Sequence, residues 1–581
     1  MAKVTIDNIQ VEVENNSTIL EAARKVGIDI PTLCYLKETN QIGACRVCQV
    51  EVKGARALAA ACVMPVSDGM VISTTSKKVR DARKATVELI LSNHNRECLT
   101  CSSNNNCELQ TIANQLGIRE IPFEGENHFG VVDTSSPSIV RDQSKCILCG
   151  RCVNVCKKEQ GSAILDFTDR GIATKVSPMF NKSLTDVPCI YCGQCVNVCP
   201  TAALREKEDM EKVWAALECP DTHVVVQTAP AVRAALGEEF GLPVGTRVTG
   251  KMVAALKRLG FDKVYDTNFA ADLTVMEEGH ELLGRLNNNG VLPLITSCSP
   301  GWIRFCEFNY PEFIPNLSSC KSPAQMLGAI IKSYYAEKTD IDPKKIFVVS
   351  IMPCISKKSE AERPEMQVNG LRDIDAVLST RELAKMIKEA RINFGSLEDS
   401  GFDQDLLGEY TGAGVIFGAT GGVMTAALRT VADVLTGQDL AELEYTAVRG
   451  LEGIKEAELE IAGKKIRVAV AHGTGNAAKL LEAIKAGTAK YDFIEIMACS
   501  GGCVTGGGQP RISAETRATV NVREARARVL AEEDAAMPLR KSHKNSQIVR
   551  LYEDYLGEPN GHRAHELLHT KYEAREAYPI G

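Results

Sequence analysis

The cysteines of this chain constrain its fold more than any other feature of the sequence. The chain has 22 cysteines among 581 residues, and many of them are separated by only two to five residues. A secreted disulfide scaffold is one alternative, but such scaffolds are short and follow an apolar signal segment, whereas this chain begins MAKVTIDNIQ. Repeated Cys-x-x-Cys pairs in a long, reduced chain indicate metal ligands instead.

The strongest local pattern is a repeat between residues 146 and 199. CILCGRCVNVCKK and CIYCGQCVNVCPT both read C-x2-C-x2-C-x3-C, and the copies start 43 residues apart. In ferredoxins with two [4Fe–4S] cubanes, the fourth cysteine of each run ligates the cluster of the other run. The pattern therefore predicts two cubanes, one on Cys146, Cys149, Cys152 and Cys199 and one on Cys189, Cys192, Cys195 and Cys156.

A second cysteine set lies near the N-terminus, in the order Cys34-x10-Cys45-x2-Cys48-x13-Cys62. Four thiolates suit a [2Fe–2S] centre, with a structural zinc site as the alternative. The flanking sequence favours the cluster, because Val4–Ile6 and Val11–Val13 alternate as strands do and Ser17-Thr18 offers a cap to the helical run Ile19–Val26. This segment resembles the β-grasp ferredoxin domains of large respiratory and hydrogenase subunits.

A third set, His94-x3-Cys98-x2-Cys101-x5-Cys107, combines one histidine with three cysteines. It resembles the [4Fe–4S] site with these ligands that complex I and hydrogenase subunits contain. Zinc is again the alternative, since both ligand types bind it. With these sets, the first third of the chain predicts a series of clusters that carries electrons to one terminal site.

Three further cysteine motifs follow three apolar segments of the second half, whose composition is that of an ordinary α/β protein. VLPLIT leads into Thr296-Ser-Cys298-Ser299-Pro-Gly-Trp302, IFVVSIM into MPCISKKSE with Cys354, and FIEIM into ACSGGC with Cys499 and Cys503. Ligand sites form at the ends of strands in α/β sheets. The four cysteines therefore predict one more cubane, although any one of them alone would be interpreted as a buried core thiol.

Together these motifs resemble the three signature motifs of [FeFe]-hydrogenases, and the resemblance extends over essentially the whole chain to the HELLH segment near its end. It implies an H-cluster, which is a [4Fe–4S] cubane joined through one cysteine to a two-iron unit with CO, cyanide and azadithiolate ligands. On this resemblance Cys503 is the bridging thiolate, and Cys354 and Cys499 are further cubane ligands.

The first motif departs from the family, which usually has two adjacent cysteines where this chain has Cys298-Ser299. One of the two family cysteines is a cubane ligand and the other is a proton relay. Because a cubane prefers thiolate to hydroxyl, we assign Cys298 as the ligand and Ser299 as a relay or bystander. The opposite assignment, with Cys298 as the relay, remains open at this point.

The resemblance also assigns roles to residues without sulfur. Lys357 would donate a hydrogen bond to one cyanide, and the backbone at Ala229-Pro230 would contact the other. A surface lysine is the alternative interpretation of Lys357, and the charged helix face of the relay glutamates, taken alone, would be interpreted as solvent-exposed. The implied apolar walls are Met352, Phe417 and Met497, and the implied proton relay is Glu278, Glu281, Arg285 and Ser318.

Three cysteines and one glycine-rich segment find no place in these sites. Cys219, Cys306 and Cys320 have no cluster partners, so we expect them to be structural. GAGVIFGATGG at 412–422 does not match the dinucleotide-binding fingerprint, so we expect a tight loop beside the cluster.

The sequence thus predicts a multidomain protein of mixed α+β and α/β class. We expect a β-grasp [2Fe–2S] domain at residues 1–78, a one-histidine, three-cysteine domain at 79–118, a two-cubane ferredoxin domain at 137–208, a large α/β catalytic domain at 209–530 and a helical C-terminal region at 531–581. A net charge of −7 argues against nucleic-acid binding, and no apolar run approaches the roughly 18 residues of a membrane span. We expect a cytoplasmic enzyme.

The predicted reaction is the reversible conversion of protons and electrons to H2. One rival is a complex I-type subunit, which lacks the MPC and MAC motifs, and another is a non-catalytic scaffold or H2 sensor of the same fold, which needs no proton relay. The extra N-terminal domains resemble those that meet flavin-bearing, NADH-oxidising subunits. We therefore expect ferredoxin and separate FMN- and NAD(P)-binding subunits as partners, with a ferredoxin-coupled monomer as the alternative.

The cluster assignments predict the metal content. One [2Fe–2S] centre, three accessory [4Fe–4S] centres and a six-iron H-cluster amount to about 20 iron atoms per chain. Elemental analysis and EPR of the anaerobically purified protein measure this content. Zinc in place of iron at the His94 site would refute that part of the assignment.

Overall fold

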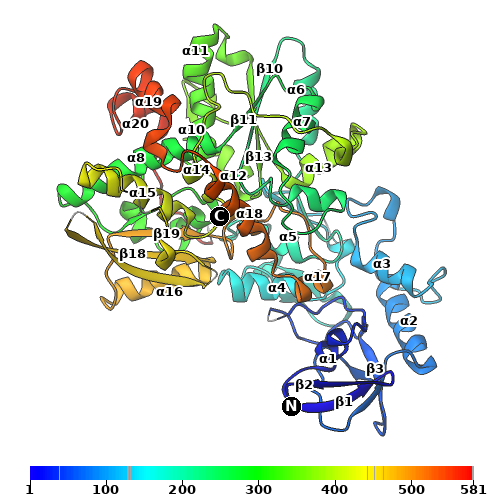
Figure 1. The fold of residues 1–581 in the computed structure, drawn as a ribbon. Coiled ribbons are helices and arrows are strands. Elements are labelled where there is room, and N and C mark those ends of the chain that lie inside the picture. Colours follow the sequence, from blue (N-terminus) through cyan, green and yellow to red (C-terminus); the bar gives the residue numbers. More distant parts are fainter. Residues whose placement is uncertain are drawn as a thin grey trace.

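The computed structural model describes residues 1–37, 39–126, 130, 132–440, 443–450, 452–461 and 463–578. The N-terminal domain forms one end of the molecule, the cysteine repeat lies in the middle, and the α/β part forms the other end (Figure 1). Within the described ranges, no helix has the length and apolar character that a membrane span requires.

The N-terminal domain is a five-stranded sheet packed on one helix. Its sheet has the order β2-β1-β5-β3-β4, and the expected strand segments at its start lie in β1 and β2. Helix α1 begins at Ile19, because the Thr18 hydroxyl accepts from the Glu21 N–H while the Glu21 carboxylate accepts from Thr18. The elements are β1 Ala2–Ile6, β2 Ile9–Val13, α1 Ile19–Lys25, β3 Gln49–Val52, β4 Ala59–Ala60 and β5 Val71–Ser73.

The cysteine repeat is also a repeat of backbone conformation. Leu148 and Tyr191 occupy the same position in the two copies and both have φ of +53°, and the following Gly150 and Gly193 have φ of +74° and +73°. Each glycine directly precedes a short helix, α4 (Arg151–Asn154) or α5 (Gln194–Val198). A Cβ on Gly193 would lie 2.5 Å from the Ile355 side chain, so this position allows the repeat to approach the second catalytic motif closely.

The segment from the N-terminal domain to the catalytic part contains mostly short elements. They are α2 Lys77–Ser92, α3 Glu108–Gln115, β6 Ile139–Arg141, α4 Arg151–Asn154, β7 Asp166–Thr168, β8 Lys175–Ser177, α5 Gln194–Val198 and β9 Leu204–Glu206. Strands β6 and β9 pair antiparallel and so bring the two ends of the cysteine repeat together.

Two four-stranded sheets form the framework of the catalytic part (Figure 1). The first has the order β11-β10-β13-β16 and is entirely parallel; the second has the order β12-β19-β18-β17 and is parallel except for β17. The strands are β10 His223–Thr228, β11 Lys263–Asp266, β12 Leu294–Ile295, β13 Ile346–Met352, β16 Ala376–Ser379, β17 Ile454–Ile461, β18 Lys464–His472 and β19 Phe493–Met497. The expected strand VLPLIT is reduced to Leu294–Ile295.

Helices surround these sheets and connect the strands. The main helices are α6 Met210–Glu218, α7 Thr249–Leu259, α8 Asn268–Asn287, α9 Pro300–Asn309, α10 Pro323–Ile330, α12 Ser356–Ala361, α13 Thr380–Glu389, α14 Gly412–Ile416, α15 Gly422–Thr436, α16 Thr474–Lys485, α17 Ala514–Thr519, α18 Val522–Ala536, α19 Ser546–Leu551 and α20 His562–Leu568. The glycine-rich segment contains α14 and the start of α15, so it is not simply a loop. The expected boundary at residue 530 falls inside α18.

One buried arginine joins the cysteine repeat to the catalytic part. Arg381, at the start of α13, donates from Nε and Nη2 to the two carboxylate oxygens of Glu206, both at 3.0 Å. It also donates to Asn197 Oδ1 and to the Gly507 carbonyl, each at 2.8 Å. The arginine holds the pKa of the buried Glu206 carboxyl well below its usual range against the effect of burial. This network fixes one element of the repeat against the loop of the third motif.

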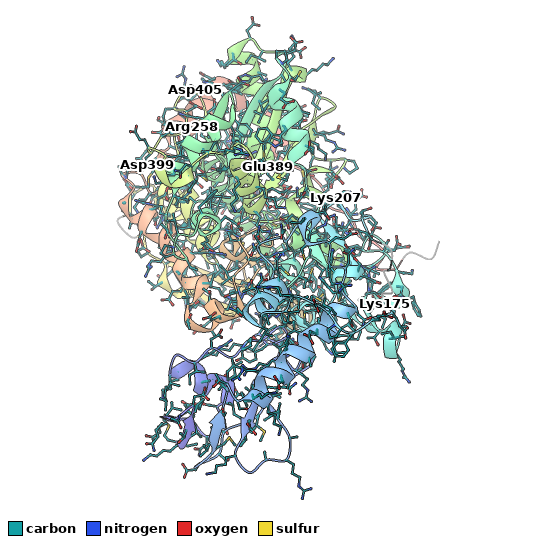
Figure 2. The ribbon with its side chains drawn as sticks, turned by 90° about the vertical axis from the view of Figure 1, so that its right-hand side faces the viewer. Lys175, Lys207, Arg258, Glu389, Asp399 and Asp405 are labelled. Carbon is teal, nitrogen blue, oxygen red and sulfur yellow. The ribbon has the colours of Figure 1, made fainter. Side chains whose placement is uncertain are left out.

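We predict that Arg381→Met destabilises the folded chain by about 3–5 kcal/mol, because it leaves the Glu206 carboxylate buried without its partner. Anaerobic thermal unfolding of the holoprotein measures the effect. Arg381→Met combined with Glu206→Gln is expected to recover part of the loss. Arg258→Met, on the exposed end of α7 (Figure 2), is the matched control. Equal unfolding temperatures for Arg381→Met and the control would contradict this role.

Candidate active site

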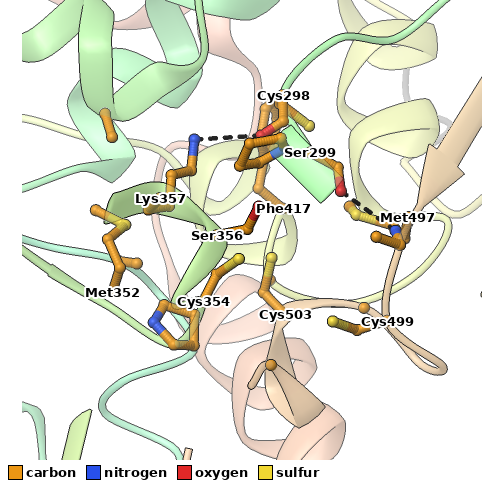
Figure 3. A pocket seen from close by; sticks show the side chains of 18 of the residues that line it. Cys298, Ser299, Met352, Cys354, Ser356, Lys357, Phe417, Met497, Cys499 and Cys503 are labelled. Atoms are coloured by element: carbon orange, nitrogen blue, oxygen red, sulfur yellow. Dashed lines mark hydrogen bonds between the residues drawn. The ribbon is translucent and has the colours of Figure 1, made fainter. Parts of the chain in front are cut away.

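The three cysteine motifs meet around one cavity of about 90 Å³. Strands β13 and β19 end two residues before Cys354 and Cys499, and β12 ends just before the first motif, so the strand ends bring the motifs together. Figure 3 shows the side chains that converge there. The predicted residues that line the cavity are Ala229, Pro230, Cys298, Ser299, Met352, Cys354, Lys357, Phe417, Met497, Cys499 and Cys503.

Three thiols, those of Cys354, Cys499 and Cys503, gather on one side of this cavity (Figure 3). Burial raises the pKa of all three thiols, that of Cys503 to about 12, and the charge of Cys354 adds to the increase for the other two. Without a nearby cation these sulfurs stay protonated at neutral pH. Iron supplies the positive charge that buried thiolates require, so this set fits a cluster.

Cys298 and Ser299 face different neighbours. Cys298 packs with Phe417 and Met497, and among charged groups Glu278 affects the pKa of its thiol most. The Ser299 hydroxyl instead accepts a hydrogen bond from the N–H of Ala498, the residue before Cys499 (Figure 3). Ser299 has extended backbone, in which successive side chains point opposite ways. The arrangement therefore places Cys298 beside apolar side chains and Ser299 next to the residue that precedes Cys499.

Lys357 is buried beside the cavity and is not the surface residue that its type alone suggests. Its ammonium donates to the Glu360 carboxylate at 2.8 and 3.0 Å and to the Cys298 carbonyl at 3.3 Å. Glu360, three residues later on the same helix face, was missed by sequence analysis, although this spacing is that of helical ion pairs. The pair holds the ammonium at the cavity wall.

The predicted relay residues form a continuous group on α8 and the loop before α10. Burial and, to a smaller extent, the charge of Glu281 raise the pKa of Glu278 to about 8, so this carboxyl is mostly protonated at neutral pH. Glu281 accepts from the Ser318 hydroxyl at 2.8 Å and from Arg285 at 2.6 Å. Arg285 also donates to carbonyls such as that of Leu317. The group therefore leads from Cys298 towards the surface.

A second set of polar residues, which was not predicted from the sequence, lies behind this group. His569 Nε2 lies 2.9 Å from the buried Glu277 carboxylate, and its Nδ1 lies 2.8 Å from the Ser319 hydroxyl. The Ser319 N–H in turn donates to Glu281 at 3.2 Å. The four-residue spacing of Glu277 and Glu281 on α8 was a usable signal, because it places both carboxylates on one helix face.

The two predicted cubane sets each line a cavity of their own. One is lined by Cys146, Cys149, Cys152 and Cys199, and the other by Cys156, Cys189, Cys192 and Cys195. Cys192 also lines the catalytic cavity, where its neighbour is Cys499. Both cavities lie in the same domain, and the second one adjoins the catalytic site.

The N-terminal thiols are likewise grouped, and their loop contacts the repeat. Cys34 contacts Cys45 and Cys62, and Cys62 contacts Cys48. The Asn40 amide donates to the Cys34 carbonyl at 2.6 Å and to the Cys149 carbonyl at 3.0 Å. Asn40 thus connects the loop of the first set to the first cysteine run of the repeat.

The His94 site has a vacant nitrogen suited to a metal. His94 is buried, and its Nδ1 has no hydrogen-bond partner among the described residues. Burial holds the pKa of the imidazole at about 4, so it is neutral, as a ligand must be. Cys107 of this set lies close to Cys101 and Cys199. Over the described ranges, no three His, Cys, Asp or Glu side chains are arranged to hold a single metal ion.

Five protein-family profiles match the chain. They are described as 2Fe-2S iron-sulfur cluster binding domain at residues 1–77, NADH-ubiquinone oxidoreductase-G iron-sulfur binding region at 83–122, 4Fe-4S dicluster domain at 145–203, iron only hydrogenase large subunit, C-terminal domain at 222–507, and iron hydrogenase small subunit at 520–575. The complex I profile covers one short region, and the hydrogenase profile covers all three catalytic motifs.

Two curated relatives are similar along their full length. The NADP-reducing hydrogenase subunit HndD of Solidesulfovibrio fructosivorans is 49% identical over 99% of both chains, and iron hydrogenase 1 of Clostridium pasteurianum is 47% identical over 98% of this chain and 100% of its own. The solved [FeFe]-hydrogenase HydA1 of Chlamydomonas reinhardtii is 44% identical over 63% of this chain and 99% of its own, with a TM-score of 0.57.

Fold, motifs and relatives together define an iron-only hydrogenase with accessory iron–sulfur domains, and the chain belongs to the [FeFe]-hydrogenase family. It is a hydrogenase catalytic subunit, that is, an oxidoreductase that acts on H2.

The Gln194 amide links the cysteine repeat to the catalytic site, since Nε2 donates to Cys499 Sγ at 3.2 Å and to the Thr505 carbonyl at 2.9 Å. Hydrogen bonds to cluster sulfurs raise reduction potentials. We predict that Gln194→Met moves the midpoint potential of the catalytic cubane to a more negative value, measured by EPR or infrared redox titration. The exposed Gln438→Met is the control, and an unchanged potential in Gln194→Met would contradict the prediction.

Proposed function

We propose that this chain interconverts H2 with protons and electrons at an H-cluster held by Cys354, Cys499 and Cys503, with Cys503 as the bridging thiolate. The observation that carries the proposal is the single cavity lined by these thiols, Lys357 and Cys298, with the buried Glu278 acting electrostatically on Cys298. When bound, the H-cluster supplies an open iron site at which H2 splits heterolytically. The side chains of this chain hold and orient the cluster, exclude water and move the proton.

In this proposal Cys298 is the proton relay, which revises our initial assignment. Its thiol is next to the apolar side chains of Phe417 and Met497, and Glu278 is its closest electrostatic partner. Glu278 is poised for this role, because a carboxyl with a pKa of about 8 both accepts and returns a proton near neutral pH.

The proton route continues from Glu278 along α8. The Ser318 hydroxyl bridges towards Glu281, and Arg285, which binds Glu281, forms the outer end of the route. Ser299 then lies beside the cubane and not on the relay. The site has three cysteines and one hydroxyl around the position that four cysteines surround in the usual family pattern.

The remaining lining residues control the environment of the cluster. Met352, Phe417 and Met497 exclude water, and a dry site strengthens the hydrogen bond that Lys357 donates to a bound ligand. The backbone at Ala229-Pro230 would contact a ligand by packing, because Pro230 has no N–H and the Ala229 N–H already donates to the Ile351 carbonyl. The Lys357 ammonium is already oriented by Glu360, so little reorganisation is needed when it binds a cyanide.

We propose that electrons reach this site through one [2Fe–2S] and three accessory [4Fe–4S] centres. Cys192 of the nearer cubane set adjoins Cys499, while Cys199 of the farther set lies next to Cys107 of the His94 site. Asn40 contacts the farther set from the loop of the [2Fe–2S] site. These contacts support two separate routes into one pair of cubanes.

Paired substitutions test the roles of the first motif. Cys298→Ala is expected to lower H2 turnover at least about 100-fold with the H-cluster signals retained, because only a proton donor is lost. Ser299→Ala is expected to leave the relay intact and to alter the cubane signal. Infrared and EPR spectra together with H2 evolution from reduced viologen provide the readouts. Loss of the cubane in Cys298→Ala would restore Cys298 as a ligand, and a spectrally complete protein without H2 turnover would favour the scaffold or sensor.

We further propose that the chain works in the cytoplasm within a hetero-oligomer whose other subunits bind FMN and NAD(P), with ferredoxin as a second electron carrier. Two routes into the cubanes suit two electron carriers. The similarity to a subunit of an NADP-reducing hydrogenase supports this arrangement. The alternative is a monomer coupled to ferredoxin alone.

The native mass of the complex from its source tests this proposal. We expect a species well above the 63.0 kDa of this chain, which reduces NAD(P) with H2. The same chain purified alone should evolve H2 from reduced viologen but should not react with NADH. A 63.0 kDa species that accounts for all activity in extract, is fully active with ferredoxin and is inert to NADH would disprove the multimer.

A further inference from the structure

A second cavity, of about 500 Å³, lies where four parts of the chain meet. Its walls come from the N-terminal domain near Lys37, the cysteine repeat near Glu159 and α5, the third-motif loop after Cys499, and α17 with the start of α18. In Figure 1, α17 and the start of α18 lie beside α4, above the N-terminal domain. This junction cavity is distinct from the catalytic cavity and has no part in the reaction described above.

Positive charge in the junction cavity exceeds negative charge. Lys37, Arg517, Arg523 and Arg526 line it, and Glu159 is the only acidic residue among its lining residues in the described part of the chain. Arg526 is neutralised by Glu238, which accepts from it at 2.6 and 2.8 Å. Glu159 accepts from Thr39 and lies 4.0 Å from Arg523, so it is a distant partner at best. Lys37, Arg517 and Arg523 therefore have Glu159 as their only acidic neighbour among the described lining residues, and Glu159 lies 4.0 Å from Arg523.

Arg517 is the least compensated of these cations. Only its Nε is used, in a hydrogen bond to the Ile512 carbonyl at 3.2 Å, and neither Nη atom has an acceptor among the described residues. Surrounding protein lowers the pKa of the guanidinium to about 10, Glu159 opposes this shift, and Arg526, Arg151 and Arg523 add to it. Part of Arg517 stays exposed to solvent, so its guanidinium is accessible to an incoming anion.

The backbone at the start of helix α18 also favours an anion in the junction cavity. Helix α18 has 15 residues, and its first residues, Asn521, Val522 and Arg523, line the cavity. The N-terminus of a helix carries partial positive charge and free N–H groups, which favour anions. Hydroxyl and amide groups of Ser500, Thr519 and Gln194 complete a polar lining.

We propose that the junction cavity binds a phosphate-type oxyanion, with Arg517 and Arg523 as its main ligands. Paired guanidinium groups suit phosphate because they donate in a planar fork. The volume is within the range of small-molecule sites, so the phosphate is either free or part of a nucleotide. This goes beyond the proposed hydrogenase function, which requires no such ligand.

Because of its position, a bound anion would affect the clusters beside the cavity. Ser500 directly follows Cys499, and Gln194 and Asn197 lie on α5 among the cysteines of the repeat. Negative charge near a cluster stabilises its oxidised state. The anion therefore shifts the potentials of the clusters beside the cavity to more negative values and links electron supply to the level of a charged metabolite.

Calorimetric titration of the anaerobic holoprotein in phosphate-free buffer tests the proposal, with inorganic phosphate in one arm and AMP in the other. Saturable binding of one anion per chain is expected. Arg517→Gln combined with Arg523→Gln should weaken it at least about tenfold, because hydrogen bonds to charged groups are lost. Arg528→Gln, on α18 but outside the cavity lining and paired with Glu532, should not. Equal affinity for phosphate and AMP identifies free phosphate as the ligand, and much tighter AMP binding identifies a nucleotide.

A second measurement does not depend on the stability of the double variant. In the unmodified holoprotein, EPR redox titrations with phosphate and with chloride at equal ionic strength should differ, with more negative midpoint potentials in phosphate. Absence of saturable binding, or unchanged affinity in the arginine variant, would overturn the site. Identical potentials in the two salts would overturn its coupling to the clusters.

Discussion

The structure depends on buried cysteine thiols, whose ionisation is unfavourable unless a positive charge lies nearby. Burial raises the pKa of the thiols of the repeat, such as Cys149 and Cys189, and of those of the catalytic cavity. A group of such thiols gains little from proximity alone, because each ionised sulfur disfavours the next. Iron reverses this balance, so the folded arrangement and the bound clusters stabilise one another.

Ion pairs between residues that are far apart in the sequence hold these groups of cysteines at fixed positions relative to one another. Arg381 binds Glu206 at the junction of the repeat and the catalytic part, and Arg151 binds Glu108 at 2.7 and 2.8 Å between the repeat and the His94 segment. Electron transfer between clusters falls steeply with distance, so small shifts between domains matter. Buried, bidentate arginine contacts restrict such shifts better than flexible surface pairs do.

Local patterns in the sequence predicted much of this structure. Short cysteine motifs predicted the sets of thiols that line shared cavities, and apolar runs predicted that β13 and β19 end close before Cys354 and Cys499. The orientation of Cys298 and Ser299 was not predictable, since it depends on backbone angles after β12 and on a partner at Ala498. Contacts such as His569 with Glu277 were also missed, because pairs 292 residues apart have no local signature.

The contact of Asn40 with Cys149 and the proximity of Cys107 to Cys199 bring both N-terminal centres to the same pair of cubanes. The two N-terminal centres would thus act in parallel, and each would deliver electrons to the same pair of cubanes. In the proposed arrangement, electrons from either centre reach the same cubanes before the catalytic site. The rate of H2 production would then depend on the total supply of electrons and not on which centre receives them.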